Sequence, residues 1–551
     1  QRTLADGSTL QELDVPFVEC LARELAAQGV EAVAIVFLHS FTNPAPERAA
    51  REAAQRAAPN MRVSISSDVV PEIREFERAS TTIANVFVQA RVERYLRELE
   101  TRLRRLGFTG SFFLMLSSGG IATVDTAVRH PVRLLESGPA AGALAATYYG
   151  QAAGYPNLLS FDMGGTTAKM CVVDQGRPLI AHDFEVARVY RFKRGSGLPI
   201  KLPVIEMIEI GTGGGSIARV DSLGLLKVGP DSAGADPGPA CYARGGNEPT
   251  VTDADLILGY LDPSYFLGGR IILDVEAAQR TLHDRIAVRL GVPLAEAAWG
   301  IHQIANENMA NAARVHALER GKDPRRFPLF AFGGAGPVHA FRIALALGSP
   351  ALLVPLGAGV TSTVGFLSAP LSFDFVRSWP ARLDALDWAR ANALLAEMEA
   401  EGQALLESSG VPGNAIVHHR EADMRYVGQG HEIRVPLPPG ELAASQHFTL
   451  LSSFEMVYRE LYERLGPPVP VEVLNWRVVS SGPAPALRLQ VTAPPDAGAQ
   501  AALKGERPAY FPEMRGFVPT RVYDRYRLPP STTFDGPAIG MSALTTNGTS
   551  S

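Results

Sequence analysis

Ten consecutive residues, Ser160–Lys169 (SFDMGGTTAK), combine the groups that a phosphate and its metal ion require. Glycine lets backbone N–H groups approach an anion closely, and hydroxyl and ammonium groups add donors. The residues that offer these groups are Gly164, Gly165, Thr166, Thr167 and Lys169. Asp162 adds a carboxylate, a group that can hold a hydrated Mg²⁺. We therefore predict a phosphate site in which Asp162 is the metal ligand and a catalytic residue. The structural alternative is a tight hairpin whose glycines only supply positive φ.

Two further glycine-rich segments have the composition of ligand loops. Gly213, Gly214 and Gly215 follow a predicted strand at Val204–Ile210, where successive backbone N–H groups can form an anion nest. An ordinary turn between strands is the alternative for this segment. The second segment consists of Gly333, Gly334, Ala335 and Gly336, between a predicted strand and a predicted helix. That position predicts contact with a nucleotide base or ribose, with a helix N-terminus behind the loop.

Asp253 is a candidate for a second catalytic carboxylate at the metal–phosphate site, because it follows the triple-glycine turn in a polar segment. Helix capping near Ala254 is an equally good explanation. His339 lies in the first turn after Pro337 and is a weaker candidate for nucleotide contact. Neither a GxGxxG fingerprint nor a GxxxxGK[ST] loop occurs, which removes the Rossmann and P-loop interpretations.

The elements that must position these residues follow an α/β rhythm. We expect helices at Pro16–Gln28, Thr81–Leu106, Gly300–Arg320 and Val338–Leu347. We expect strands at Ala32–Leu38, Ser111–Leu116, Leu158–Phe161, Ala168–Val173 and Pro328–Phe332. After about Pro370, a helix-rich stretch at Leu383–Ser408 precedes strands at Glu432–Leu437, Val471–Val479 and Leu487–Val491, which predicts a mostly β C-terminal domain.

Composition excludes several classes of protein. The 551 residues are 46% hydrophobic and 20% charged, as in folded multidomain enzymes. The net charge is −5 and no basic stripe is present, so nucleic acid is not an expected partner. Three cysteines without a CxxC pair fit a reducing cytoplasm. No apolar run reaches the roughly 18 residues of a membrane span, so no membrane partner is expected.

Eight segments in order along the chain resemble the hydantoinase A / 5-oxoprolinase / acetone carboxylase β-subunit family. They are FLHSFTNP (Phe37–Pro44), PEIREFERASTT (Pro71–Thr82), ESGPAAG (Glu136–Gly142), FDMGGTTAK (Phe161–Lys169), GTGGGSIA (Gly211–Ala218), DPGPACYARGG (Asp236–Gly246), FGGAGPVHA (Phe332–Ala340) and DMRYVGQG (Asp423–Gly430). Lys169 departs from the pattern, because many members have an acidic residue there.

The resemblance implies an actin-like ATPase fold, in which two RNase-H-like domains clamp ATP. Asp162–Thr167 would be the second phosphate loop and Gly333–Gly336 the adenosine loop. The implied segments are 1–156 (remainder of the first RNase-H-like domain), 157–372 (second such domain) and 373–551 (C-terminal α+β domain). Family members begin with a first DxGGT loop that this sequence lacks, so we expect an N-terminally truncated chain. The ending MSALTTNGTSS, after Phe534–Gly540, has the character of a tag or foreign tail.

The function implied by the resemblance is ATP- and Mg²⁺-dependent opening of a small cyclic amide such as hydantoin, N-methylhydantoin or 5-oxoproline. The family pattern adds a hydantoinase B-like partner subunit and hence a hetero-oligomer. Two alternatives stay open at this point. One is an acetone- or acetophenone-type carboxylase β subunit, and the other is a nucleotide-binding scaffold without catalysis.

Overall fold

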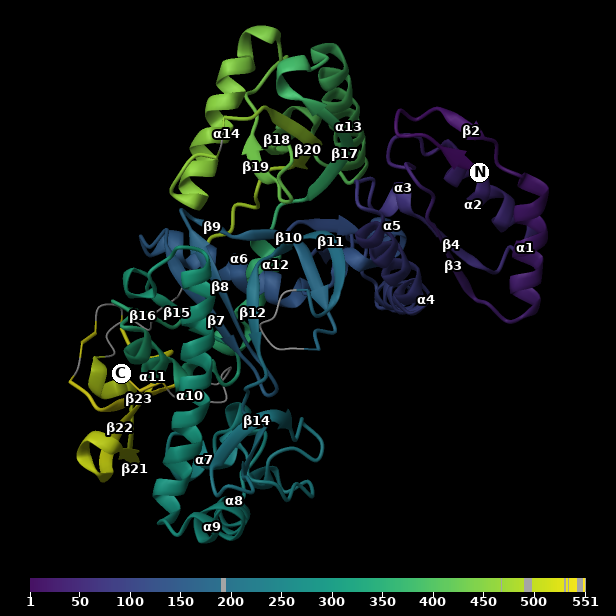
Figure 1. Ribbon diagram of the computed structural model, residues 1–551. Coiled ribbons are helices and arrows are strands. Elements are labelled where there is room, and N and C mark those ends of the chain that lie inside the picture. The colour runs from purple at the N-terminus through teal and green to yellow at the C-terminus, as the bar shows by residue number, and fades with distance from the viewer. Residues whose placement is uncertain are drawn as a thin grey trace. The chain divides into compact units, whose positions relative to one another are not determined.

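The computed structural model describes residues 1–189, 195–466, 468–489, 498–529, 532–533, 535–542 and 549–550. These residues form two compact units, each assembled from segments far apart in sequence (Figure 1). Unit 1 consists of Gln1–Ala140, Ile180–Val204 and Ala369–Pro485, and unit 2 of Ala141–Leu179, Ile205–Ser368 and Ala486–Ser551. Both units mix helices and sheets, which confirms the α/β class. Because each unit combines segments from different parts of the chain, the division does not decide the consecutive domains 1–156, 157–372 and 373–551, which stay a prediction.

The sheet at the centre of unit 2 has the strand order β12-β8-β7-β15-β16, with β9 paired to β8. Its strands are β7 (Leu158–Met163), β8 (Ala168–Asp174), β9 (Arg177–Pro178), β12 (Met207–Ile210), β15 (Leu329–Phe332) and β16 (Leu352–Leu353). Pairs β12–β8 and β8–β7 are antiparallel, whereas β7–β15 and β15–β16 are parallel. This order and mixture of directions is that of an RNase-H-like sheet, as expected. The apolar residues of β7 and β15 are almost all buried, because both faces of the sheet are covered.

Three helices of unit 2 carry or brace the loops of interest: α7 (Val251–Ile257), α10 (Leu294–Glu319) and α11 (Gly336–Leu347). Helix α10 contacts α7, α11 and the strands β8 and β12 (Figure 1). Its alanine and methionine residues at helical spacing enter the same apolar core as Phe161 and Met163 of β7. The loops therefore rest on a well-packed base.

The other elements of unit 2 complete its surface and, within the described residues, form two smaller sheets. They are α6 (Ser137–Ala152, which begins in unit 1), β13 (Ser216–Val220), β14 (Leu226–Ser232), α8 (Val275–Leu282), α9 (Val288–Leu290), α12 (Ser362–Ser368), α15 (Ala499–Ala502), β21 (Leu503–Phe511), β22 (Gly516–Asp524), β23 (Ala538–Met541) and β24 (Thr549–Ser550). Strands β21 to β24 form a four-stranded sheet in sequence order. Residues 490–491 of the predicted strand Leu487–Val491, Phe534 and most of the predicted tail, residues 543–548 and 551, lie outside the described residues.

Unit 1 contains a parallel strand pair and a separate antiparallel sheet. The first part has β1 (Arg2–Thr3), β2 (Thr9–Gln11), α1 (Val15–Ala27), β3 (Ala32–Ile35), α2 (Ala45–Ala57), β4 (Arg62–Ile65), α3 (Ser66–Val69), α4 (Glu75–Arg105), β5 (Phe113–Met115), β6 (Ile121–Thr123) and α5 (Val124–Arg129). The second has β10 (Ile180–Val186), β11 (Leu198–Ile205), β17 (Ser372–Arg382), α13 (Trp388–Ser408), β18 (Val417–Tyr426), β19 (Ile433–Pro436), α14 (His447–Tyr462) and β20 (Val471–Ser481). Strands β17-β20-β18-β19 form the antiparallel sheet, around Trp476 and Phe454.

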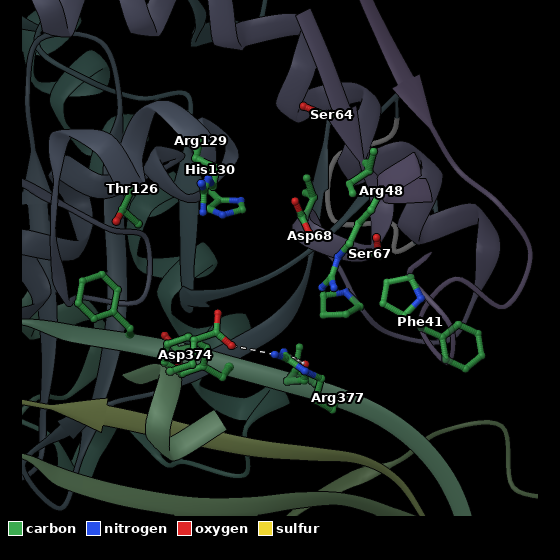
Figure 2. A pocket seen from close by; sticks show the side chains of 18 of the residues that line it. Phe41, Arg48, Ser64, Ser67, Asp68, Thr126, Arg129, His130, Asp374 and Arg377 are labelled. Atoms are coloured by element: carbon green, nitrogen blue, oxygen red, sulfur yellow. Dashed lines mark hydrogen bonds and ion pairs between the residues drawn. The ribbon is translucent and has the colours of Figure 1, made fainter. Parts of the chain in front are cut away.

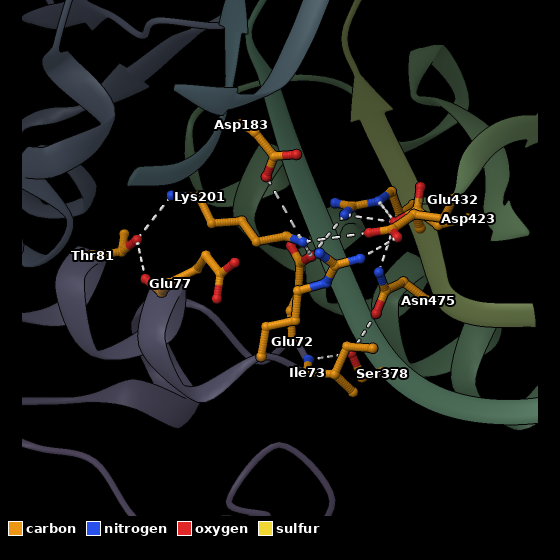
Figure 3. Close-up of polar contacts among 12 residues, drawn as sticks. Glu72, Ile73, Glu77, Thr81, Asp183, Lys201, Ser378, Asp423, Glu432 and Asn475 are labelled. Carbon is orange, nitrogen blue, oxygen red and sulfur yellow. Dashed lines mark hydrogen bonds and ion pairs between the residues drawn. The ribbon is translucent and has the colours of Figure 1, made fainter. Parts of the chain in front are cut away.

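A network of buried charges joins three distant segments of unit 1 (Figure 3). The Arg477 guanidinium contacts Glu72 at 2.9 Å and Asp423 at 2.8 Å. Lys201 contacts Glu72 at 3.3 Å and Glu432 at 3.7 Å. Because an unpaired charge is costly in a protein interior, these pairs tie residues 72, 201 and 477 into one arrangement.

Most predicted elements are confirmed, with differences at several positions. Helices α4 and α10 begin earlier than predicted, at Glu75 and Leu294. The predicted strand Val204–Ile210 is interrupted at Glu206, because the Glu206 N–H donates to the Leu179 carbonyl instead of continuing a ladder. Helix α14 was not predicted, so the region after residue 372 is less purely β than expected. Among the described residues, no helix is long and apolar enough to cross a membrane.

Candidate nucleotide-binding site

Asp162 lies at the C-terminal end of β7, opposite Lys169 on β8 and beside Phe332 on β15. Burial raises the pKa of its carboxyl group to about 6, and the Lys169 ammonium offsets only part of the rise. No described residue donates a hydrogen bond to this carboxylate or forms an ion pair with it within 4.0 Å. A half-buried carboxylate that Lys169 compensates only in part is a group that a bound cation would satisfy.

The turn after Asp162 has glycines that neither packing nor backbone conformation requires. A Cβ atom added to Gly164 or Gly165 would meet nothing within 4 Å, and neither residue has a positive φ. The turn is closed by the Gly164 N–H, which donates to the Thr167 carbonyl at 3.1 Å. The hairpin alternative, in which these glycines only supply positive φ, is therefore wrong. Open space at both positions fits the close approach of a ligand to the backbone.

The triple-glycine segment packs directly beneath this turn. The N–H groups of Gly214 and Gly215 donate to the carbonyls of Gly164 and Gly165, at 3.1 and 2.6 Å. The Gly213 N–H donates to the Ser216 hydroxyl at 2.9 Å, and a Cβ on Gly213 would lie 2.6 Å from the Thr166 backbone. All three donors are thus engaged within the protein. The geometry favours a supporting platform for the turn, and direct anion contact by these glycines stays a prediction.

The predicted nucleotide loop lies against Asp162. Gly333 has a φ of +87°, and a Cβ there would be 2.4 Å from the Asp162 Oδ1 atom, so only glycine fits. The Ala335 N–H donates to the Met163 carbonyl at 2.9 Å, and α11 begins at Gly336 with Pro337 in its first turn. Because β7 and β15 are parallel, Asp162, the 164–167 turn and residues 333–336 meet at one edge of the sheet.

Lys169 and Asp253 have partners that differ from those expected. The Lys169 Nζ atom contacts the Glu209 carboxylate at 3.1 Å, on the neighbouring strand β12. Asp253 is fully buried, and its carboxylate accepts hydrogen bonds from the N–H groups of Ala240, Cys241 and Thr250. It also forms a capping box with Thr250 at the start of α7. The capping explanation is favoured by this geometry, and a catalytic role for Asp253 stays a prediction.

Sequence patterns missed a buried polar cluster two residues beyond Asp253. Asp255 contacts the ring nitrogens of His302 at 2.7 Å and of His339 at 3.2 Å. His339, a weak candidate for nucleotide contact, is fully buried in this cluster. The only sequence signal was the spacing of His302 and Asn306, which are four residues apart and share one face of α10.

Unit 1 contains a cavity of about 1700 Å³ that no sequence motif indicated. Side chains of both charges line it, including Arg48, Arg129, Asp374 and Arg377, together with the His130 ring (Figure 2). The mixture of signs does not define a single class of ligand. The arrangement suited to a phosphate is the one in unit 2.

Comparisons with known proteins agree with this geometry. The family described as hydantoinase/oxoprolinase matches residues 78–375, and its N-terminal region and C-terminal domain match residues 1–58 and 388–547. Caprolactamase subunit alpha of Pseudomonas jessenii is 34% identical over 552 residues, covering 99% of this chain and 77% of that protein.

Two solved structures share the fold over the whole chain. The ATP-dependent caprolactamase of Pseudomonas jessenii matches with a TM-score of 0.85 and 32% identity, covering 100% of this chain and 79% of that chain. A nucleotide-free acetone carboxylase matches with a TM-score of 0.78 and 26% identity, covering 100% and 78%.

Proposed function

Because the chain belongs to the hydantoinase/oxoprolinase family, we propose that it is the ATP-dependent subunit that phosphorylates and opens a cyclic amide. Hydantoin, N-methylhydantoin, 5-oxoproline and related lactams are the substrate class. One observation carries the proposal: the half-buried Asp162 carboxylate, to which no described residue donates a hydrogen bond, lies beside an open glycine turn that the loop 333–336 flanks. The ATP dependence of the similar caprolactamase supports it.

The chemistry required is transfer of a phosphoryl group to the amide oxygen. Transfer of the γ-phosphoryl group releases ADP and makes the amide carbon more electrophilic. Water then adds to this carbon, the ring C–N bond breaks as the nitrogen takes up a proton, and the resulting acyl phosphate is hydrolysed to a carboxylate and phosphate. Positioning and charge stabilisation supply most of the catalysis in phosphoryl transfer. Mg²⁺, when bound, neutralises phosphate charge, and the Asp162 carboxylate is the group whose chemistry fits as its ligand.

Other residues of unit 2 would hold the phosphates. The backbone of Gly164 and Gly165 and the hydroxyls of Thr166 and Thr167 can donate to phosphate oxygens. The N-terminus of α11 adds the positive end of a helix dipole. Asp162 orients the metal or the attacking group, and the platform of Gly213–Gly215 keeps the turn in place.

Hydrolysis of the activated amide would require a hydantoinase B-like partner, which makes the working enzyme a hetero-oligomer. The similar caprolactamase chain is named as an alpha subunit, which supports this arrangement.

The test is co-purification with a B-type subunit and measurement of ADP release with hydantoin, N-methylhydantoin, 5-oxoproline and caprolactam. We expect at least one cyclic amide to stimulate ADP release, and Asp162→Ala to abolish the stimulation. Absence of stimulation by every cyclic amide in the intact complex would contradict the proposal.

A carboxylase subunit is the second candidate, because the acetone carboxylase structure covers the whole chain. Bicarbonate-dependent ATP turnover with a ketone, and none with cyclic amides, would decide for it. Nucleotide binding that survives Asp162→Ala with unchanged partner activity would instead favour a non-catalytic scaffold.

A further inference from the structure

Three helices of unit 2 meet at a buried polar cluster formed by Asp255 on α7, His302 on α10 and His339 on α11. The Asp255 Oδ1 atom lies 2.7 Å from His302 Nδ1, and Oδ2 lies 3.2 Å from His339 Nε2. The side chains are 3%, 1% and 0% exposed. His339 Nδ1 lies 2.8 Å from the Asn306 side-chain oxygen, one turn along α10 from His302. The cluster is therefore continuous across all three helices.

The cluster places one buried carboxylate between two buried imidazole rings. Burial lowers the pKa of His302, so its Nδ1–H donates to Asp255 as a neutral ring. Burial opposes ionisation of Asp255, but His339 and His302 lower the pKa of its carboxyl group to about 2. The Asn306 side-chain oxygen accepts a hydrogen bond from the His339 Nδ1–H, and the Nε2 atom of the same ring faces the Asp255 carboxylate at 3.2 Å.

A metal site is the other chemistry that two histidines and an aspartate can offer. The two imidazole rings stack, with centroids 4.6 Å apart and planes inclined by 18°. A ring nitrogen directs its lone pair within the ring plane, and nearly parallel planes do not meet at a common ion. The arrangement fits a set of polar contacts that joins three helices and not a coordination site. We call Asp255, His302, His339 and Asn306 the clasp.

Each end of the clasp is one helical turn from a loop of the candidate site. On α7, the Thr252 N–H and hydroxyl both donate to the Gly214 carbonyl, at 2.8 Å each. On α11, His339 follows the loop in which the Ala335 N–H donates to Met163. Asp255 thus connects the platform under the phosphate turn to the nucleotide loop beside it.

We propose that Asp255, His302 and His339 are positioning residues. They hold the nucleotide loop (333–336) and the glycine platform (213–215) in fixed positions next to the phosphate turn. This inference rests on the proposed nucleotide site. None of the three residues need contact the nucleotide. Their effect is to keep both loops in the binding geometry before the ligand arrives, so that little ordering accompanies binding.

The test measures amide hydrogen exchange at residues 213–215 and 333–336 in the nucleotide-free full chain, and the affinity for Mg·ATP by calorimetry. In Asp255→Ala we expect faster exchange in both loops and an affinity about tenfold weaker, as expected for lost buried hydrogen bonds. Asp255→Asn should retain exchange and affinity within about twofold, because the carboxamide oxygen can accept from the His302 Nδ1–H while its NH2 group donates to His339 Nε2.

The matched control is His316→Asn, a buried histidine on α10 outside the clasp. It should lower the melting temperature without faster exchange in either loop. Should Asp255→Ala fail to fold, Asn306→Ala removes only the outer bond to His339 and should loosen residues 333–336 alone.

Three outcomes separate the possibilities. Equal loop exchange in Asp255→Ala and His316→Asn would overturn the clasp, and so would unchanged exchange at 333–336 in Asn306→Ala. If the loops respond as expected but the wild-type chain binds no nucleotide, the clasp stands and the proposed function fails.

Discussion

At the level of single residues, the candidate site depends on side chains whose surroundings in this chain do not account for them. Asp162 is half-buried and receives no hydrogen bond from the described residues, and Gly164 and Gly165 leave open space where a side chain would fit. Gly213 and Gly333 differ from them, because the fold itself excludes a Cβ at these positions. Gly164 and Gly165 are therefore candidates for ligand contact, whereas packing within the fold requires glycine at positions 213 and 333.

The charge on Asp162 should cost stability in the absence of metal. A carboxyl whose folded pKa is raised from 3.8 to about 6 loses stability as the pH rises through this window. The full penalty above that window is up to about 3 kcal/mol, at about 1.4 kcal/mol for each pKa unit. Asp162→Asn should be more stable than wild type at pH 7.5, with a gain that shrinks toward pH 5. Urea unfolding in EDTA measures this, and equal or lower stability of the variant at pH 7.5 would contradict it.

Alanine substitutions at Gly165 and Gly213 should distinguish a loss of ligand affinity from a loss of stability. Gly165→Ala meets no atom within 4 Å, so stability should change by less than about 0.5 kcal/mol while Mg·ATP affinity falls. Gly213→Ala brings a Cβ to 2.6 Å from the Thr166 backbone and should cost about 1–3 kcal/mol of stability. Thermal unfolding and calorimetry distinguish the two, and full ATP affinity in Gly165→Ala would count against a phosphate at this turn.

At the level of elements, α7 links the glycine platform to the helical core through its first turn. Its capping box uses Thr250 and Asp253, and Thr252 holds the Gly214 carbonyl. Helix α11 begins at Gly336, the last residue of the nucleotide loop, and so fixes the end of that loop to the core. The loops are therefore positioned by helix termini and not by their own sequences alone.

Removal of the Asp253 carboxylate should lower the stability of the folded chain. Asp253→Ala leaves three buried N–H donors without acceptors, and at about 1–3 kcal/mol each the free energy of unfolding should fall by several kcal/mol. Asp274→Ala, at the N-cap of α8, is the matched control and should cost only about 1 kcal/mol. A variant with wild-type stability but no ATP turnover would instead restore the catalytic role predicted from sequence.

At the level of the whole molecule, each unit is assembled from chain segments that only meet after folding. In unit 1 the meeting point is the buried network around Arg477 (Figure 3). Two of the segments that carry the family resemblance, 71–82 and 423–430, supply Glu72 and Asp423 to it. These two residues of the motifs therefore have a role in the assembly of unit 1.

Arg477→Met should destabilise unit 1 strongly, because it leaves Glu72 and Asp423 without their shared cation in a buried setting. The expected cost is about 3–5 kcal/mol. Arg382→Met breaks an exposed pair with Asp384 and should change stability by less than about 1 kcal/mol. Urea unfolding of both variants makes the comparison, and equal effects would show that the network does not stabilise unit 1.

The sequence by itself determined the elements and loops whose signals lie within about a dozen neighbouring residues. These include the strand–turn–strand at Leu158–Val173 and the strand–loop–helix at Pro328–Leu347, which are confirmed with small shifts at their ends. Only the tertiary structure decided that Gly333 lies against Asp162, that the glycine platform donates to the phosphate turn, and that Asp255 joins two histidines. Those contacts depend on burial and approach between residues far apart in the chain, which a local pattern of residue types does not record.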